Sequence, residues 1–147
     1  MRSQFQVDPR CFETGESGRE IEVVVPYTGA DVTGAVLERA LALTAGLDAT
    51  ITLVAVHAVP YPSSFSCPAA VHAHLVEQLL DLAGRCPLPV NPLVVLARSR
   101  EDGFRHALKP GSTVLVGTRR HFWRTPEEKL ARALARDGHN VALVHIA

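Results

Sequence analysis

The chain lacks the cysteine patterns that mark small metal-binding or disulfide-rich domains. It contains three cysteines in 147 residues, an odd number, and no two of them form a Cys-x-x-Cys pair. Cys11, Cys67 and Cys86 are far apart in the sequence, which argues against a structural zinc site and against a thioredoxin-like redox pair. Separate free thiols are typical of a reducing compartment, so we expect a cytoplasmic protein.

Long apolar runs and an excess of one charge are absent as well. Charged residues such as Glu38 and Asp48 interrupt the richest apolar stretch, so no segment reaches the roughly 18 apolar residues of a membrane span. Residues 1–19 have no apolar region of the kind found in a secretory signal. Fifteen basic residues balance fifteen acidic ones, whereas surfaces that bind nucleic acid or anionic membranes usually carry a positive excess. We therefore predict no nucleic acid and no membrane as partners.

Patterns for catalysis and for metal binding are also missing. His72 and His74 lie two residues apart on an expected helix and point to different faces, and the other five of the seven histidines are scattered singly. No spacing of His or Cys matches a metal ligand set, and neither a Gly-x-Ser-x-Gly elbow nor a P-loop occurs. We predict no metal site and no catalytic residues. An enzyme is the least favoured interpretation, and it would require a deep pocket lined by Tyr27, His57 and Arg119.

What the sequence does contain is a regular alternation of apolar strands and amphipathic helices that begins at residue 20. Near-continuous apolar strands between such helices indicate a parallel sheet that is covered on both faces. We therefore predict an α/β domain over residues 20–147, a three-layer α/β/α doubly wound sheet of five strands, after a polar N-terminal arm at 1–19. The expected strands are 21–26, 50–56, 93–97, 113–117 and 141–146. The expected helices are 32–45, 68–84, 101–108 and 126–136.

Helix ends and buried faces follow from the same pattern. Asp31 is expected to cap the first helix, and Gly46 is expected to end it. The residues expected on buried faces are Val36, Ala40 and Leu43 in the first helix and Val71, Leu75, Leu79 and Leu82 in the second.

The last helix has a complete start signal of its own in Thr125-Pro126-Glu127-Glu128. Thr125 is expected to cap the helix, Pro126 suits its first position, and Glu128 can reach back in a capping box. Two carboxylates then occupy the positive end of the helix dipole, which is where a phosphate would bind. This arrangement argues against a polyphosphate at the start of this helix.

The order of strands and helices and several local motifs resemble the universal stress protein family. The segment VVVPYTGADVTGAVLERAL is similar to the family's opening strand and turn, with Thr28 in place of an aspartate and Gly29 at a glycine. The resemblance covers about residues 20–147. It implies a Rossmann-like sheet with the strand order 3-2-1-4-5, and in many members ATP binds at the switch point between strands 1 and 4.

The family's ATP motif is incomplete in this chain. ATP-binding members carry Gly-x-x-Gly, about nine residues and then Gly-Ser or Gly-Thr after strand 4. Gly117 matches the first glycine, Arg120 stands at the second, and Thr125 is the only stand-in for the hydroxyl. Backbone amides can cradle phosphates only where no side chain blocks a close approach. We therefore expect a degenerate member without ATP in the usual mode, and no cofactor.

The alternative is a nucleotide such as ATP or AMP, or another anion, held at the switch point by a modified loop. Arg119, Arg120, Arg124 and His121 could hold an anion through their side chains, or they could pair with acids of the surface. Phe122 and Trp123 in the same loop could pack on the core, stack on a base or bind a partner. The residues of this candidate site are Pro26, Thr28, Val56, Gly117, Arg119, Arg120 and Thr125.

The last strand, 141–146, is expected at the edge of the sheet. An exposed apolar edge favours pairing with another chain, and the resemblance implies a homodimer through this strand. The expected interface residues are Val141, Leu143 and His145. Two alternatives remain open, namely a different protein partner and coverage of this edge by the arm at 1–19.

Overall fold

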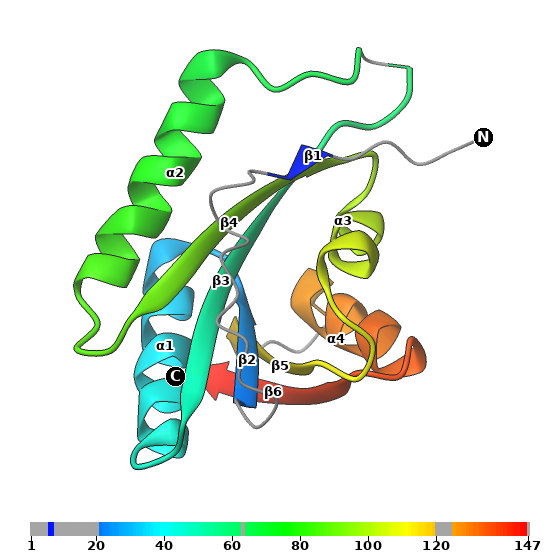
Figure 1. The fold of residues 1–147 in the computed structure, drawn as a ribbon. Helices are drawn as coiled ribbons and strands as arrows, with labels where there is room; N and C mark the ends of the chain where they lie inside the picture. The colour runs from blue at the N-terminus through cyan, green and yellow to red at the C-terminus, as the bar shows by residue number, and fades with distance from the viewer. Residues whose placement is uncertain (1–5, 8–20, 63, 120–124, 147) are drawn as a thin grey trace.

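The computed structural model describes residues 6–7, 21–62, 64–119 and 125–146 (Figure 1). Its sheet confirms the predicted fold class, because five parallel strands lie in the order β4-β3-β2-β5-β6. Numbered along the chain, these five strands have the order 3-2-1-4-5. The strands are β2 (Ile21–Pro26), β3 (Ala49–Ala58), β4 (Val90–Ala97), β5 (Thr113–Arg119) and β6 (Asn140–Ile146).

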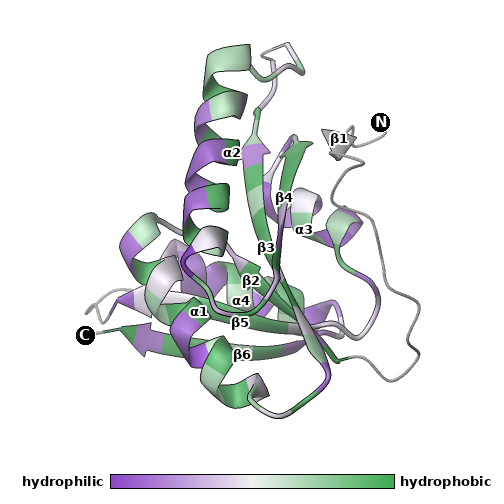
Figure 2. Cartoon of the chain, turned by 60° about the vertical axis from the view of Figure 1, so that its left-hand side comes forward, coloured by the Kyte–Doolittle hydropathy of each residue, from purple (hydrophilic) through white to green (hydrophobic). Residues whose placement is uncertain are grey.

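Within the described residues, four helices cover the two faces of the sheet (Figure 1). Helices α1 (Ala30–Thr44) and α2 (Ala69–Gly84) enclose one apolar core, and α3 (Arg100–Ala107) and α4 (Pro126–Arg136) enclose the other. The strands are predominantly apolar, whereas the helices alternate between apolar and polar positions (Figure 2). None of the helices in the described ranges combines the length and the hydropathy that crossing a membrane requires.

A short sixth strand at the far edge of the sheet was not predicted. β1 (Gln6–Val7) pairs antiparallel with β4, where Gln6 lies opposite Leu96 and Val7 lies opposite Val95. The described part of the N-terminal arm therefore lies at the edge opposite to β6. The alternative in which the arm covers 141–146 is wrong for these two residues.

The start of α1 differs from the prediction. Gly29, not Asp31, occupies the capping position, with φ at 117°, and no side chain caps the helix. Only glycine adopts such a φ readily, so the chain turns one residue before Ala30 and leaves Asp31 inside the first turn. Gly46, with φ at 77°, lies just beyond the end of α1 and confirms the predicted stop.

Two residues expected on buried helix faces are exposed instead. Leu43 is 59% exposed, because the buried stripe of the last turn of α1 runs through Ala40 and Thr44 and leaves Leu43 beside it. Val71 is 39% exposed, because α2 buries its residues in its second half, at Leu79 and Leu82. Periodicity predicts which side of a helix is apolar, and the contact with the sheet decides how far along the helix that side is covered.

Candidate functional site

A pocket lies at the carboxyl ends of β2 and β5, where the strand order reverses. β2 pairs with β3 along its whole length, but with β5 it pairs only at Val23 and Val24. Beyond these residues the two strands separate, and a pocket of about 270 Å³ is found there. Open α/β sheets bind ligands at such a switch point. The pocket is lined by Thr28, Val32, Gly117, Thr118, Arg119, Thr125, Pro126 and Glu127.

Four of the seven predicted site residues come together in this pocket, namely Thr28, Gly117, Arg119 and Thr125. Pro26 is buried at the end of β2 and does not line it. Val56 does not line it either, because its side chain lies against Gly103 of α3. Arg120 lies outside the described residues, as do His121, Phe122, Trp123 and Arg124.

The three side chains named for a catalytic pocket, Tyr27, His57 and Arg119, do not come together here. Arg119 lines the pocket, but Tyr27 and His57 do not. The Tyr27 hydroxyl donates a hydrogen bond to Oε1 of Gln78 in α2 (3.0 Å), and burial raises its pKa above the ordinary value for tyrosine. No group of three or more His, Cys, Asp or Glu side chains that could hold a metal ion occurs in the ranges that the structure describes.

The start of α4 is closed, as the sequence predicts. Thr125 is the capping residue, and its Oγ1 accepts a hydrogen bond from the amide of Glu128 (3.2 Å). Pro126 has no amide hydrogen, and the amide of Lys129 donates to the carbonyl of Thr125 (3.2 Å). Only half of the capping box forms within the described residues, because the Glu128 carboxylate accepts no hydrogen bond from the amide of Thr125.

Thr118, which the sequence analysis did not select, is part of the same arrangement. Its Oγ1 lies 2.8 Å from Oγ1 of Thr125, and both residues are buried. Thr118 Oγ1 also donates to the carbonyl of Arg119 (3.3 Å), so the hydroxyl of Thr125 is left to donate to Thr118. The available signal was a threonine directly after the apolar residues 114–117 of a buried strand, where a hydroxyl needs a partner.

Gly117 has a packing function in this chain. A Cβ atom at this position would overlap Cγ2 of Val36 and would lie 2.7 Å from Cγ1 of Val32. Both valines belong to α1, so the missing side chain allows α1 to lie close to β5. The close approach of this helix is a sufficient physical reason for a glycine here.

The charges around the pocket are balanced. Nη2 of Arg119 lies 3.7 Å from Oδ2 of Asp31, and Oε1 of Glu127 lies 3.8 Å from Nη1 of Arg100. The carboxylate of Asp31 is almost fully exposed and that of Glu127 is partly exposed, so both remain available to repel an anion. The hydroxyl of Thr28 is buried and finds no hydrogen-bond partner among the described residues.

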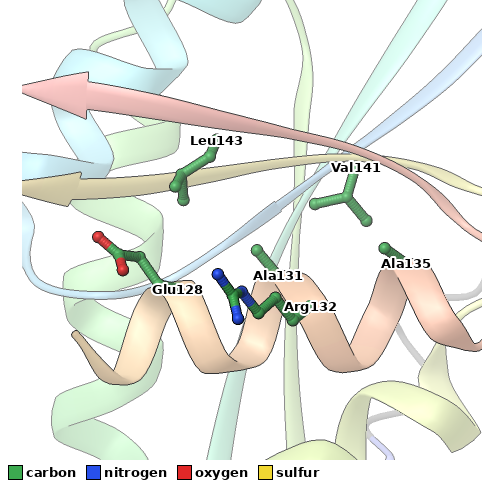
Figure 3. Close-up of a pocket in the computed structure, with 6 residues that line it drawn as sticks. All are labelled: Glu128, Ala131, Arg132, Ala135, Val141 and Leu143. Atoms are coloured by element: carbon green, nitrogen blue, oxygen red, sulfur yellow. The ribbon is translucent and has the colours of Figure 1, made fainter. Parts of the chain in front are cut away.

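The residues predicted for a dimer interface lie on β6, the last strand of the sheet in the described part of the chain. Val141 and Leu143 point toward α4 and line a groove of about 240 Å³ between the strand and the helix (Figure 3). His145 is exposed further along the strand, opposite Thr118 of β5.

No model of a known protein family matches the chain, and no curated protein matches it at a significant level. The fold and the site therefore define its class, which is a Rossmann-like α/β domain with a small pocket at the switch point of the sheet.

Proposed function

We propose that the protein is a binding or regulatory module of the universal-stress-protein type that does not bind ATP in that family's usual mode. The observation that carries this proposal is the closed start of α4. The first position has no amide hydrogen at Pro126, and the amide of Glu128 is already bonded to Thr125. A triphosphate could therefore not take the amide of Glu128 without displacing the cap.

Electrostatics supports the same proposal. A triphosphate in the pocket would face the carboxylate of Glu127, and Arg119, the one cation that lines the described pocket, already lies 3.7 Å from the carboxylate of Asp31. Gly117, the remaining trace of the glycine motif, has a packing reason to be a glycine. The two residues that match the family's ATP motif thus have structural roles of their own. Gly117 lets α1 lie close to β5, and Thr125 caps α4.

Isothermal titration with ATP, ADP and AMP in the presence of Mg²⁺ tests this proposal. We expect no binding heat for any of the three nucleotides. A micromolar affinity for ATP would overturn it. The Glu127→Gln variant separates the two reasons for the absence of ATP binding, namely the charge of Glu127 and the cap at Thr125. If ATP binds to this variant and not to the wild type, charge is the cause and the cap is not.

The module is proposed to work as a homodimer through β6 in the cytoplasm. The supporting observations are the position of β6 at the edge of the described sheet and the partly exposed Val141 and Leu143. Analytical ultracentrifugation checks the dimer. We expect Val141→Lys to produce monomers and Leu43→Lys, an exposed leucine on α1, to leave the dimer intact. A monomeric wild-type protein would refute the homodimer.

A second candidate function is an anion site in the same pocket, for a nucleotide or a smaller anion held by side chains. It is favoured by the buried hydroxyl of Thr28, which lacks a partner in the described residues, beside the guanidinium of Arg119. Thermal unfolding with AMP, ATP or phosphate tests it. Stabilisation that Arg119→Ala abolishes and Arg39→Ala retains would support it, and no stabilisation of the wild type would exclude it.

A further inference from the structure

Helix α4 is flanked by two grooves that share Arg132 and Ala135. The groove on the β6 side holds about 240 Å³ and has an apolar floor (Figure 3). Its lining residues are Glu128, Ala131, Arg132, Ala135, Val141 and Leu143. The groove on the α3 side holds about 700 Å³ and has basic walls. Its lining residues are Glu101, Arg105, Lys129, Arg132, Ala133, Ala135 and Arg136.

Three cations lie along the exposed side of α4. Lys129, Arg132 and Arg136 are spaced at i, i+3 and i+7, which places them on one side of a helix. All three are exposed, and none of them forms an ion pair with an acid in the described part of the chain. Glu128 lies one turn before Arg132 without pairing with it.

Three of the neighbouring acids are already engaged with other cations. Asp102 and Asp137 both contact Arg105, at 3.3 Å and 3.0 Å, and Glu127 contacts Arg100. The hydrogen bond and the charge of Asp137 raise the pKa of Arg105 above the ordinary arginine value. Glu101 is the one acid that lines the groove on the α3 side. The exposed side of α4 therefore carries a local positive excess although the chain as a whole is neutral.

We propose that this surface of α4 docks an acidic, amphipathic helix of another protein. This inference rests on the proposed function as a module that acts through protein contacts, and it names the chemistry of the partner. Two or three carboxylates of the partner would contact Lys129, Arg132 and Arg136. One or two of its aliphatic side chains would enter the groove at its α4 wall, over Ala131 and Ala135, which leaves Val141 and Leu143 to the proposed dimer interface.

The spacing of the cations fits such a helix. At a rise of about 1.5 Å per residue, Lys129 and Arg132 are separated by about 4.5 Å along the axis, and Lys129 and Arg136 by about 10.5 Å. Carboxylates at i, i+3 or i+4, and i+7 of a partner helix repeat at the same intervals. Arg132 borders both grooves, so charge pairing and apolar contact would occur on adjoining strips.

A protein partner fits these observations better than a nucleic acid. The balanced total charge gives no long-range attraction for a polyanion. The apolar groove between α4 and β6 would also have no counterpart in a phosphate backbone, whereas an amphipathic helix presents aliphatic side chains beside its acids.

The test uses a displayed library of randomised helical peptides selected on the immobilised full-length protein. We expect the enriched sequences to carry acids at i, i+3 or i+4, and i+7 beside aliphatic residues. A labelled peptide from this selection should bind at least tenfold more weakly to the double variant Arg132→Glu, Arg136→Glu. The matched control is Arg39→Glu on α1, on the other face of the sheet, which should bind like the wild type.

Several outcomes would overturn the inference. These are a selection without enrichment, enriched peptides without the acidic pattern, equal binding by the double variant, and tighter binding of a labelled DNA duplex than of the peptide. The nucleotide titration and the sedimentation of the double variant are measured in parallel. If the double variant stays dimeric and binds no nucleotide but no longer binds the peptide, the loss is assigned to this surface. Nucleotide binding by the wild type, or a monomeric wild type, would instead count against the proposed function alone.

Discussion

The hydroxyls of Thr118 and Thr125 lie 2.8 Å apart in a buried position, where they join the end of β5 to the start of α4. The same Thr125 oxygen caps α4 by accepting the amide of Glu128. This pair of side chains thus caps α4 and also fixes the start of α4 against the end of β5. It also forms part of the wall of the pocket at the switch point.

Removing either hydroxyl should destabilise the protein. We expect Thr125→Ala to cost about 1–2 kcal/mol, because it removes a helix cap, and Thr118→Val to cost about 1 kcal/mol, because it leaves the Thr125 hydroxyl without its acceptor. The double variant should show a coupling energy of about 0.5–1.5 kcal/mol in urea unfolding. Thr50→Val on β3 is the control, since the Thr50 hydroxyl has no hydrogen bond within the described residues. Strictly additive effects of the two threonines would contradict this prediction.

The elements of the fold were predictable because each carries its own local signal. Ile21–Pro26 and Pro126–Arg136 match their predicted bounds, since a β-branched run ending in proline and a Thr-Pro start both define an end within the segment itself. β5 extends beyond the predicted Gly117 to Arg119, because it stays paired with β6 as far as Ile146. That pairing is a tertiary contact, and no local pattern encodes it.

The site was predictable only in part for the same reason. Thr28, Gly117 and Thr125 lie at or just after the carboxyl ends of β2 and β5, which are neighbours in the sheet, so topology brings them together. Val56 was misplaced because its side chain faces α3, where Gly103 makes room for it. The sequence alone predicts neither the packing function of Gly117 nor the partner of Thr118, because both depend on how α1 and α4 lie against the sheet.

Gly117→Ala should destabilise the protein strongly, although Gly117 does not lie in a turn. Its Cβ would overlap Val36 and crowd Val32, so α1 would have to move away from β5. Overpacking of this kind costs about 1–3 kcal/mol, measured as a shift in the urea midpoint. The double variant Gly117→Ala, Val36→Ala should lose less stability than the sum of the two single losses, which a purely conformational effect at position 117 would not allow.

Gly84→Ala is the matched control for Gly117→Ala. Gly84 is the last residue of α2, and a Cβ atom there would meet nothing within 4 Å. We expect no loss of stability, or a gain of up to about 1 kcal/mol, because alanine favours a helix more than glycine does. Equal destabilisation by the two substitutions would contradict the packing function of Gly117.

The thiol of Cys86 should titrate late in the folded protein. Burial and the nearby charge of Glu38 both raise its pKa above the value of 9.0 for an unperturbed thiol. The folded state therefore binds this proton more tightly than the unfolded chain, so its contribution to stability is present at neutral pH and is lost as the pH rises above 9.

The measurement is the rate of alkylation against pH for a variant in which Cys11 and Cys67 are replaced by serine. The thiolate is the reacting species, so the midpoint of this profile reports the pKa of the Cys86 thiol. We expect a higher midpoint in the folded protein than in the same variant in guanidinium chloride. Glu38→Gln should lower the folded midpoint, and identical folded and denatured profiles would refute the prediction.

Arg98 holds the chain that follows β3. Its guanidinium lies 4.2 Å from the ring centre of Tyr61 and 5.0 Å from that of Phe65, and its Nη1 donates to the carbonyl of Val59 (3.3 Å). Lysine cannot reproduce a planar group that stacks on a ring while donating at its edge. Arg98→Lys should therefore loosen this connection while leaving the sheet intact.

Cation–π contacts at such partly exposed sites contribute about 0.5–1 kcal/mol each, so losing both would raise the local opening equilibrium by about 5- to 30-fold. This is the upper bound for Arg98→Lys, because an ammonium group can still contact one ring. Chymotrypsin cleaves after Phe65, whereas Pro62 protects the bond after Tyr61, and the cleavage rate at low protease concentration reports this opening. Arg85→Lys serves as the control, because its ion pair with Asp81 lies on exposed α2 surface and should not affect cleavage. If Arg98→Lys were cleaved no faster than Arg85→Lys, the two rings would be held by their own packing and not by the guanidinium.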